Sequence, residues 1–165
     1  MTLHEYQIEA ARTCPDLEDK DNILHMNIGI LTELGELADL FKKHYAYGKE
    51  LDLVHIGEEI ADMFWYRANL DRIKGYTYNP NYHIGVLDDN SPLITSIEGI
   101  MNSLVEFYDR NFFATLFGIA NFYSLNIETL LNNNIAKLRI RYPEKFDTEK
   151  ALNRRLELER KELEK

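Results

Sequence analysis

The chain has 165 residues, which is enough for one domain with a substantial hydrophobic core. Hydrophobic residues make up 45% of it and aromatic residues 12%, so the composition is that of a folded globular protein and excludes a disordered one. The formal net charge is −9, which disfavours nonspecific binding to nucleic acid or to an anionic membrane surface.

The sequence indicates neither export nor membrane insertion. Residues 1–6 have neither the basic start nor the apolar core of a signal peptide. No stretch approaches the roughly 20 apolar residues of a membrane helix. Cys14 is the single cysteine, so no intrachain disulfide can form. We therefore expect a cytoplasmic protein that binds no membrane and no nucleic acid.

The hydrophobic pattern predicts helices throughout the chain and no strand of any strength. Thr2 and Glu5 carry the signature of a capping box, so a short helix is expected to begin there and to stop before Pro15. The first long helix is expected over residues 22–46, with Asp21 as its N-cap. It is apolar almost all round, which is typical of a helix at the centre of a bundle or in a subunit interface.

A second long helix is expected over about residues 52–73, after a turn at Gly48. An insertion of about residues 71–112 then begins with a loop rich in Tyr, Asn and Pro, and a helix is expected over 91–110. The remaining predicted helices cover residues 112–123 and 127–141 and a charged C-terminal segment from Asp147 or Thr148 onward. The predicted fold class is therefore all-α, in a single domain that spans residues 1–165.

Two pairs of carboxylates stand on the two long helices. Glu33 and Glu36 lie three residues apart on the first helix, and Glu59 and Asp62 do so on the second. Positions i and i+3 share one face of a helix, so each pair presents two carboxylates side by side in apolar sequence. Like charges on an apolar surface repel each other and lose hydration, so a counter-charge is required. A divalent cation with oxygen ligands would supply it, and Mg²⁺ is the usual ion where phosphates are the substrate.

Three neighbours of these pairs are interpreted as their surroundings. Glu58 is rotated away by about one residue step and is a flank of the site. His55 lies one turn before Glu59 and is interpreted as a surface or packing residue. Gly29 costs roughly 1 kcal/mol of helix stability relative to Ala, which indicates either a closely approaching group or a helix-packing contact. A solvated face is the alternative interpretation of either pair alone, but two pairs on adjacent helices favour a metal site.

A polar stripe marks the last core helix. Asn134, Lys137 and Arg141 fall on one face at i, i+3 and i+7. An amide and two cations in line suit anionic oxygens, although a solvated face explains the stripe equally well without further context. Acids outnumber bases in residues 33–62, whereas bases outnumber acids in residues 137–165. The acidic segment and the basic segment could therefore meet at one site, with a metal ion and a polyanion bound between them.

Several segments together resemble a known family. They are Tyr6-Gln7 with residues 11–13, Asn22 to His25, Glu33 to His44, Gly57 to Tyr66, and the closing run Asn134-Ile-Ala-Lys-Leu-Arg-Ile-Arg-Tyr-Pro-Glu-Lys-Phe146. These segments resemble the MazG-like nucleotide pyrophosphohydrolases of the all-alpha NTP pyrophosphatase superfamily. The resemblance covers about residues 4–70 and 115–147. The insertion of about 71–112 departs from the family, whose single-domain members have a short join there.

The resemblance implies a four-helix core bundle with an inserted helical segment and a charged C-terminal helix. It implies an enzyme that uses Mg²⁺, with Mn²⁺ as the alternative ion. The reaction is hydrolysis of a nucleoside triphosphate between the α and β phosphates, which gives a monophosphate and pyrophosphate. The residues that it implies are Glu33, Glu36, Glu59 and Asp62 for metal binding and catalysis, Asn134, Lys137 and Arg141 for the phosphates, and Tyr66 near the nucleotide.

Family members are dimers or tetramers with sites near subunit contacts, so a homodimer or homotetramer is expected. The resemblance suggests a role in nucleotide-pool house-cleaning. One alternative is a dUTPase or dCTPase of the same superfamily that selects its base, since base recognition lies near the insertion in related enzymes. The other is a helical interaction module without catalysis.

Overall fold

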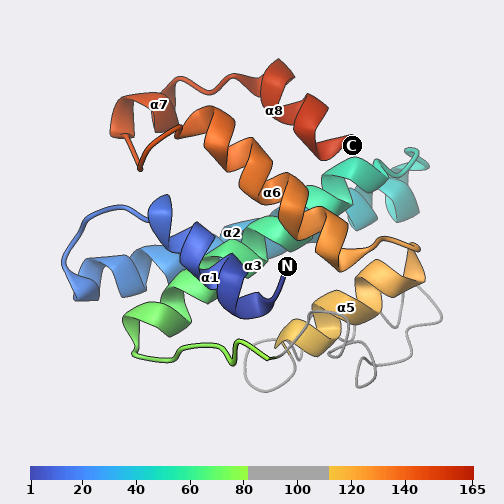
Figure 1. Cartoon of the computed structure of the whole chain (residues 1–165). Coiled ribbons are helices and arrows are strands. Elements are labelled where there is room, and N and C mark those ends of the chain that lie inside the picture. Colours follow the sequence, from blue (N-terminus) through green and yellow to red (C-terminus); the bar gives the residue numbers. More distant parts are fainter. Residues whose placement is uncertain (82–111) are drawn as a thin grey trace.

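The structure is a computed structural model that describes residues 1–81 and 112–165. The helix expected over 91–110 lies outside the described residues. Within them every regular element is a helix, which confirms the predicted all-α class (Figure 1). The elements are α1 (Leu3–Arg12), α2 (Asp19–Tyr47), α3 (Leu53–Ile73), α5 (Phe112–Phe122), α6 (Ile127–Arg141), α7 (Thr148–Leu152) and α8 (Leu156–Leu163). In the described part of the chain, no helix is both long and apolar enough to span a membrane.

Local signals set several helix ends, and those at Thr2 and Gly48 agree with the prediction. The backbone N–H of Glu5 donates to Thr2 Oγ1 at 3.1 Å, and the N–H of Thr2 donates to Glu5 Oε2 at 2.7 Å, which completes the capping box. Gly48 ends α2 with φ at 65°, a left-handed conformation that favours glycine. Asp52 and Asn126 accept hydrogen bonds from the first turns of α3 and α6.

Two predicted boundaries are wrong. Helix α2 begins at Asp19, so the predicted N-cap Asp21 lies inside its first turn, where a negative charge still favours the helix dipole. The expected single C-terminal helix is divided into α7 and α8, because the backbone leaves the helical conformation at Asn153. The break places Arg154 in the connection between two short helices.

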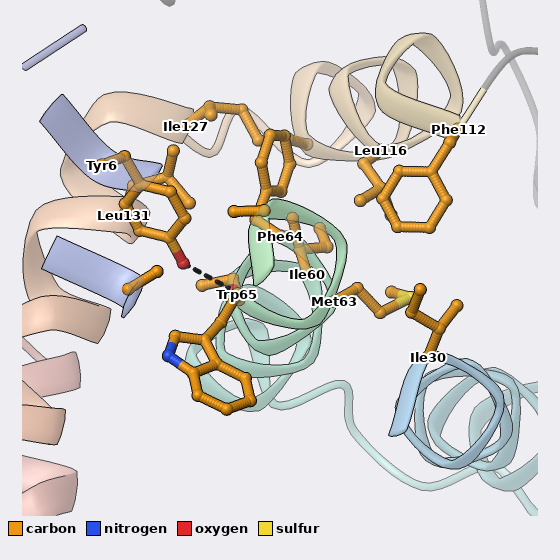
Figure 2. Close-up of a cluster of buried hydrophobic side chains, with 14 of the residues drawn as sticks. Tyr6, Ile30, Ile60, Met63, Phe64, Trp65, Phe112, Leu116, Ile127 and Leu131 are labelled. Carbon is orange, nitrogen blue, oxygen red and sulfur yellow. Dashed lines mark hydrogen bonds between the residues drawn. The ribbon is translucent and has the colours of Figure 1, made fainter. Parts of the chain in front are cut away.

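Helix α3 lies at the centre of the fold and contacts α1, α2, α5, α6 and α8. Burial of apolar side chains contributes about 25 cal/mol per Å², so a helix surrounded on several sides is firmly anchored. Figure 2 shows apolar side chains of α3 meeting those of four other helices: Ile60, Met63, Phe64 and Trp65 with Tyr6, Ile30, Leu116, Ile127 and Leu131. The polar residues of α3 are thereby fixed in position relative to α2 and α6.

Helix α2 packs one face against α3 and leaves another uncovered within the single chain. Met26, Ile30 and Leu37 belong to the buried core. By contrast, Leu24 and Ile28 are 58% and 50% exposed. The segment of α7 and α8 lies on the other side of the molecule from α5, and α8 packs on α6 (Figure 1).

Candidate functional site

A cavity of about 540 Å³ lies among residues of α2, α3, the end of α6 and the α7–α8 segment. Carboxylates reach it from α2 and α3. Cations reach it from α6 and from the connection between α7 and α8, and aromatic rings complete the wall. The lining residues are Thr13, His25, Glu33, Glu36, His55, Glu58, Glu59, Asp62, Trp65, Tyr66, Leu138, Arg141, Tyr142, Phe146, Ala151, Arg154 and Leu156.

The four predicted carboxylates converge on this cavity. Glu33 and Glu36 reach it from α2, and Glu59 and Asp62 reach it from α3. Because α2 and α3 pack along each other, the i, i+3 pair on each helix faces the pair on its neighbour. Glu59 is buried with 3% of its surface exposed, whereas Glu36 is exposed. The group therefore combines a buried carboxyl with one that faces solvent.

Burial governs the protonation of two of these acids. Loss of water raises the pKa of Glu33, although its hydrogen bond with Glu59 partly offsets the rise. Burial raises the pKa of Glu59 to about 10, and the hydrogen bond and charge of Glu33 act in the same direction. Glu59 is therefore protonated at neutral pH without a counter-ion, and a cation bound beside it would favour the ionised form.

Asp62 is held by two residues of α6. Lys137 Nζ lies 2.7 and 2.6 Å from the two carboxylate oxygens, and Asn134 Nδ2 donates to one of them at 2.5 Å. The Lys137 side chain is fully buried and also lies 3.2 Å from Glu58 Oε1. Tyr6 donates to Asn134 Oδ1 at 3.1 Å, so the amide is itself held in place. Lys137 thus supplies a positive charge to the carboxylates from inside the fold.

His55 and Glu58 lie at the site, although the sequence placed them in its surroundings. His55 Nε2 is 2.7 Å from Glu59 Oε1. One ligand atom each from Glu36, His55 and Glu59 lie within 4.8 Å of one another, a spacing suited to a shared metal ion. The i, i+4 relation between His55 and Glu59 is the sequence signal for this pair.

Arg141 pairs with a carboxylate of α8. Its Nε donates to Glu159 Oε1 at 3.1 Å, and its Nη2 contacts the other carboxylate oxygen. Arg154 Nη2 donates to that same oxygen at 3.2 Å and lies 3.8 Å from Glu58 Oε1. Burial lowers the pKa of Arg141, but the hydrogen bond and charge of Glu159 outweigh this and raise it. Both arginines line the cavity together with the acids.

Aromatic rings give the cavity a flat apolar surface. The Tyr66 ring makes edge contacts with Trp65 and His25, with centroids 4.9 and 5.8 Å apart. Tyr142 and Phe146 form another pair at 5.3 Å. A wall with rings beside carboxylates and arginines suits a ligand that is flat and apolar at one end and anionic at the other.

The position of Tyr66 depends on Gly29 in α2. A Cβ built on Gly29 would lie 2.1 Å from Tyr66 Cε1, which is far inside van der Waals contact. The close approach expected at this glycine is therefore made by a side chain of the cavity wall.

Six of the eight residues predicted for the site line the cavity: Glu33, Glu36, Glu59, Asp62, Tyr66 and Arg141. Asn134 and Lys137 are buried behind the wall; both contact the lining residue Asp62, and Lys137 also contacts the lining residue Glu58. Sequence reasoning missed Arg154 and Glu159. Their pairing depends on the break between α7 and α8, for which the sequence offers no clear signal.

No family model, curated protein or solved structure matches the chain. A function is therefore inferred from the residues of the cavity.

Proposed function

We propose that the chain is a Mg²⁺-dependent nucleoside triphosphate pyrophosphohydrolase with the four-helix core of the MazG-like family. The observation that carries the proposal is the meeting of two carboxylate pairs, Arg141 and Tyr66 in one cavity. Carboxylates suit a hard divalent cation, a guanidinium suits phosphate, and an aromatic ring suits a nucleotide base. A triphosphate with its metal and base needs these three kinds of contact together.

The donor set fits a hard divalent cation. Glu33, Glu36, Glu59 and Asp62 offer only oxygen atoms, which Mg²⁺ prefers. Burial is the main cause of the raised pKa values of Glu33 and Glu59, so a cation bound beside these acids would favour their ionised forms. His55 adds a nitrogen donor beside Glu59, and imidazole binds transition metals, so Mn²⁺ is the alternative ion. Such an ion, when bound, neutralises phosphate charge and lowers the pKa of a bound water.

The proposed roles follow from where the side chains lie. Glu33 is the candidate general base, because burial raises its pKa and therefore its affinity for the proton of an attacking water. Glu36, which is exposed, is the alternative. Lys137 and Asn134 orient Asp62, and a direct phosphate contact by Lys137 would require it to leave that carboxylate. Arg141 would stabilise the charge that develops on the leaving phosphates.

Attack at the α phosphorus is the proposed reaction. Enzymes that release the γ phosphate often cradle it in a GxxxxGK[ST] loop, and this sequence contains none. The attacking water would form a bond to the α phosphorus while the bond from that phosphorus to the bridging oxygen breaks. The proton of the water passes to the carboxylate base, and pyrophosphate leaves as one unit.

A panel of ribo- and deoxyribonucleoside triphosphates, assayed for pyrophosphate with Mg²⁺ in ¹⁸O-labelled water, tests the proposal. The label is expected in the nucleoside monophosphate and not in pyrophosphate. Asp62→Asn should abolish Mg²⁺-dependent turnover. The matched control Asp39→Asn removes a carboxylate of α2 that does not line the cavity, and it should retain turnover. The same panel identifies a selective dUTPase or dCTPase. Absence of pyrophosphate from every triphosphate would leave a non-catalytic module.

We also propose that the chain forms a homodimer or homotetramer through α2. Leu24, Ile28 and Leu31 follow each other at i, i+4 and i+7, and each is at least half exposed in the single chain. Exposed apolar patches of this kind often form subunit interfaces. The carboxylates of the same helix would then lie near the interface.

A further inference from the structure

We propose that the α7–α8 segment supplies a phosphate-binding residue, Arg154, and that the buried carboxylate of Glu159 positions Arg154 and Arg141 to bind the pyrophosphate moiety. The inference deepens the proposed function and takes its substrate class from it. Its central claim is binding of a pyrophosphate anion, which can be measured without turnover.

The first observation is the charge balance around Glu159. The carboxylate of Glu159 is 2% exposed and accepts hydrogen bonds from both Arg141 and Arg154. Two guanidinium groups share this one carboxylate, and the other carboxylate beside Arg154, that of Glu58, lies at 3.8 Å, which is too far for a hydrogen bond. In the described ranges, the contacts of Arg154 are made by its Nε and Nη2, so Nη1 is available to donate to an anion.

The second observation is the location of Arg154. Its side chain is 41% exposed and lines the cavity that holds the carboxylates. It lies 3.8 Å from Glu58, which pairs with Lys137, and Lys137 in turn holds Asp62. Arg154 is thus joined to the carboxylate group by a short chain of ion pairs. A polyphosphate with one end at a metal on those acids would find Arg141 and Arg154 on the same wall.

The third observation is how firmly Glu159 is placed. A buried carboxylate is stable only when it is paired, and here its partners are two guanidinium groups with planar, forked donors. The next residue, Arg160, donates to Asp52 Oδ1 at 3.0 Å and thereby ties α8 to the start of α3. Because the helix is interrupted at Asn153, Arg154 leaves the helical path just where its side chain meets Glu159. The buried carboxylate of Glu159 thus holds the guanidinium groups of two arginines in fixed positions.

Calorimetric titration with inorganic pyrophosphate in the presence of Mg²⁺ tests the binding claim. Arg154→Gln should weaken binding about tenfold to a hundredfold, the loss of one charge-assisted hydrogen-bonding group. The pyrophosphate affinity of Arg154→Lys should lie between those of the wild type and Arg154→Gln, since an ammonium keeps the charge but lacks the forked donors. The matched control Arg155→Gln removes the adjacent charge, which does not line the cavity, and should bind like the wild type. Mg²⁺ alone should bind all four proteins equally.

Positioning by Glu159 has its own readout. Circular dichroism first checks that Glu159→Gln is folded. The affinity of this variant for pyrophosphate should be lower than that of the wild type. Adding Arg154→Gln to it should lower the affinity much less than the same substitution does in the wild type. Additive losses would overturn the positioning role, because two independent defects do not share one partner.

The outcomes separate this inference from the proposed function. Wild-type protein that binds no pyrophosphate, or Arg154→Gln that binds it normally, would overturn the inference even if triphosphates are hydrolysed. Pyrophosphate binding that is lost in Arg154→Gln, in a protein that cleaves no triphosphate, would support the anion site and refute the hydrolase. For an active enzyme, the same variant should raise KM or lower kcat, whereas Arg155→Gln should change neither.

Discussion

Glu59 is an acid whose ionisation the folded chain opposes. Its pKa is raised to about 10, whereas the pKa of an unperturbed glutamic acid is about 4.3. Above that lower value the unfolded chain has released its proton and the folded chain still holds it, so stability falls as pH rises toward the folded pKa. In EDTA, the melting temperature of the wild type should therefore fall between pH 5 and pH 8 by more than that of Glu59→Gln. Scanning calorimetry measures both.

The comparison isolates one residue, because all other titrating groups are shared by the two proteins. Asp39→Asn is the matched control, since Asp39 is a half-buried carboxylate whose pKa is lowered to about 2 by hydrogen bonds from Lys42 and Lys43. It should keep the pH slope of the wild type. Parallel slopes for wild type and Glu59→Gln would contradict the prediction. Mg²⁺ should restore wild-type stability at pH 8, where ionised carboxylates bind it.

The pair of Asp62 and Lys137 sets a second prediction at the residue level. Mutual repulsion alone would make the removal of Asp62 stabilising, but the fully buried ammonium of Lys137 depends on that carboxylate at 2.6 Å. Asp62→Asn and Lys137→Met should each destabilise the metal-free protein, by up to roughly 3 kcal/mol, because each variant removes one charge of the pair and leaves the other with only Glu58 or Asn134 beside it. The double variant should lose at least about 1 kcal/mol less than the sum. Urea unfolding in EDTA measures this, and additive losses would show that the pair is energetically independent.

At the level of elements, the pairing of α2 with α3 depends on Gly29. Gly29→Ala forces the Tyr66 ring to move, because the new Cβ would lie 2.1 Å from it. Overpacking of this kind costs about 1–3 kcal/mol, more than the roughly 1 kcal/mol that alanine contributes to helix stability. The variant should be less stable in thermal unfolding and should show an altered tyrosine environment by NMR.

Gly35 on the same helix is the matched control. Nothing lies within 4 Å of a Cβ built there, so Gly35→Ala should stabilise the protein by up to about 1 kcal/mol. In a Tyr66→Ala background, Gly29→Ala should also become stabilising. If Gly29→Ala destabilises equally with and without the Tyr66 ring, another contact is responsible.

The elements also show which structure the sequence predicts well. Capping at Thr2 and the left-handed end at Gly48 depend on residues within one turn, so their signals are local. The i, i+3 pairs likewise placed four acids on facing helices. The pairing of Lys137 with Asp62 depends instead on how α6 crosses α3, and a stripe on α6 alone cannot distinguish phosphate from a buried carboxylate as its partner. The contact of Glu58 with Lys137 could not be predicted for the same reason, so sequence reasoning identified Glu58 only as a flank of the site.

For the molecule as a whole, the uncovered face of α2 leads to a prediction about assembly. Light scattering at micromolar concentration should give two or four times the 19.4 kDa of the chain. Ile28→Lys should reduce the assembly to a folded monomer, because it places a charge in the apolar stripe. Leu152→Lys changes a residue of α7 that is 80% exposed and should leave the assembly intact. A wild type that scatters as a single 19.4 kDa species would overturn the prediction.

The buried contact between Lys137 and Asp62 has a consequence for how such a chain can diverge. A descendant that changed Asp62 alone would leave the buried ammonium of Lys137 with Glu58 as its carboxylate partner, and one that changed Lys137 alone would leave Asp62 without its cation, so either intermediate would be less stable. Replacement of both by apolar or uncharged residues restores a stable interior, as replacement of buried ion pairs often does. A joint change at positions 62 and 137 should therefore be tolerated better than either single change, whereas Glu36, which is exposed, can change on its own.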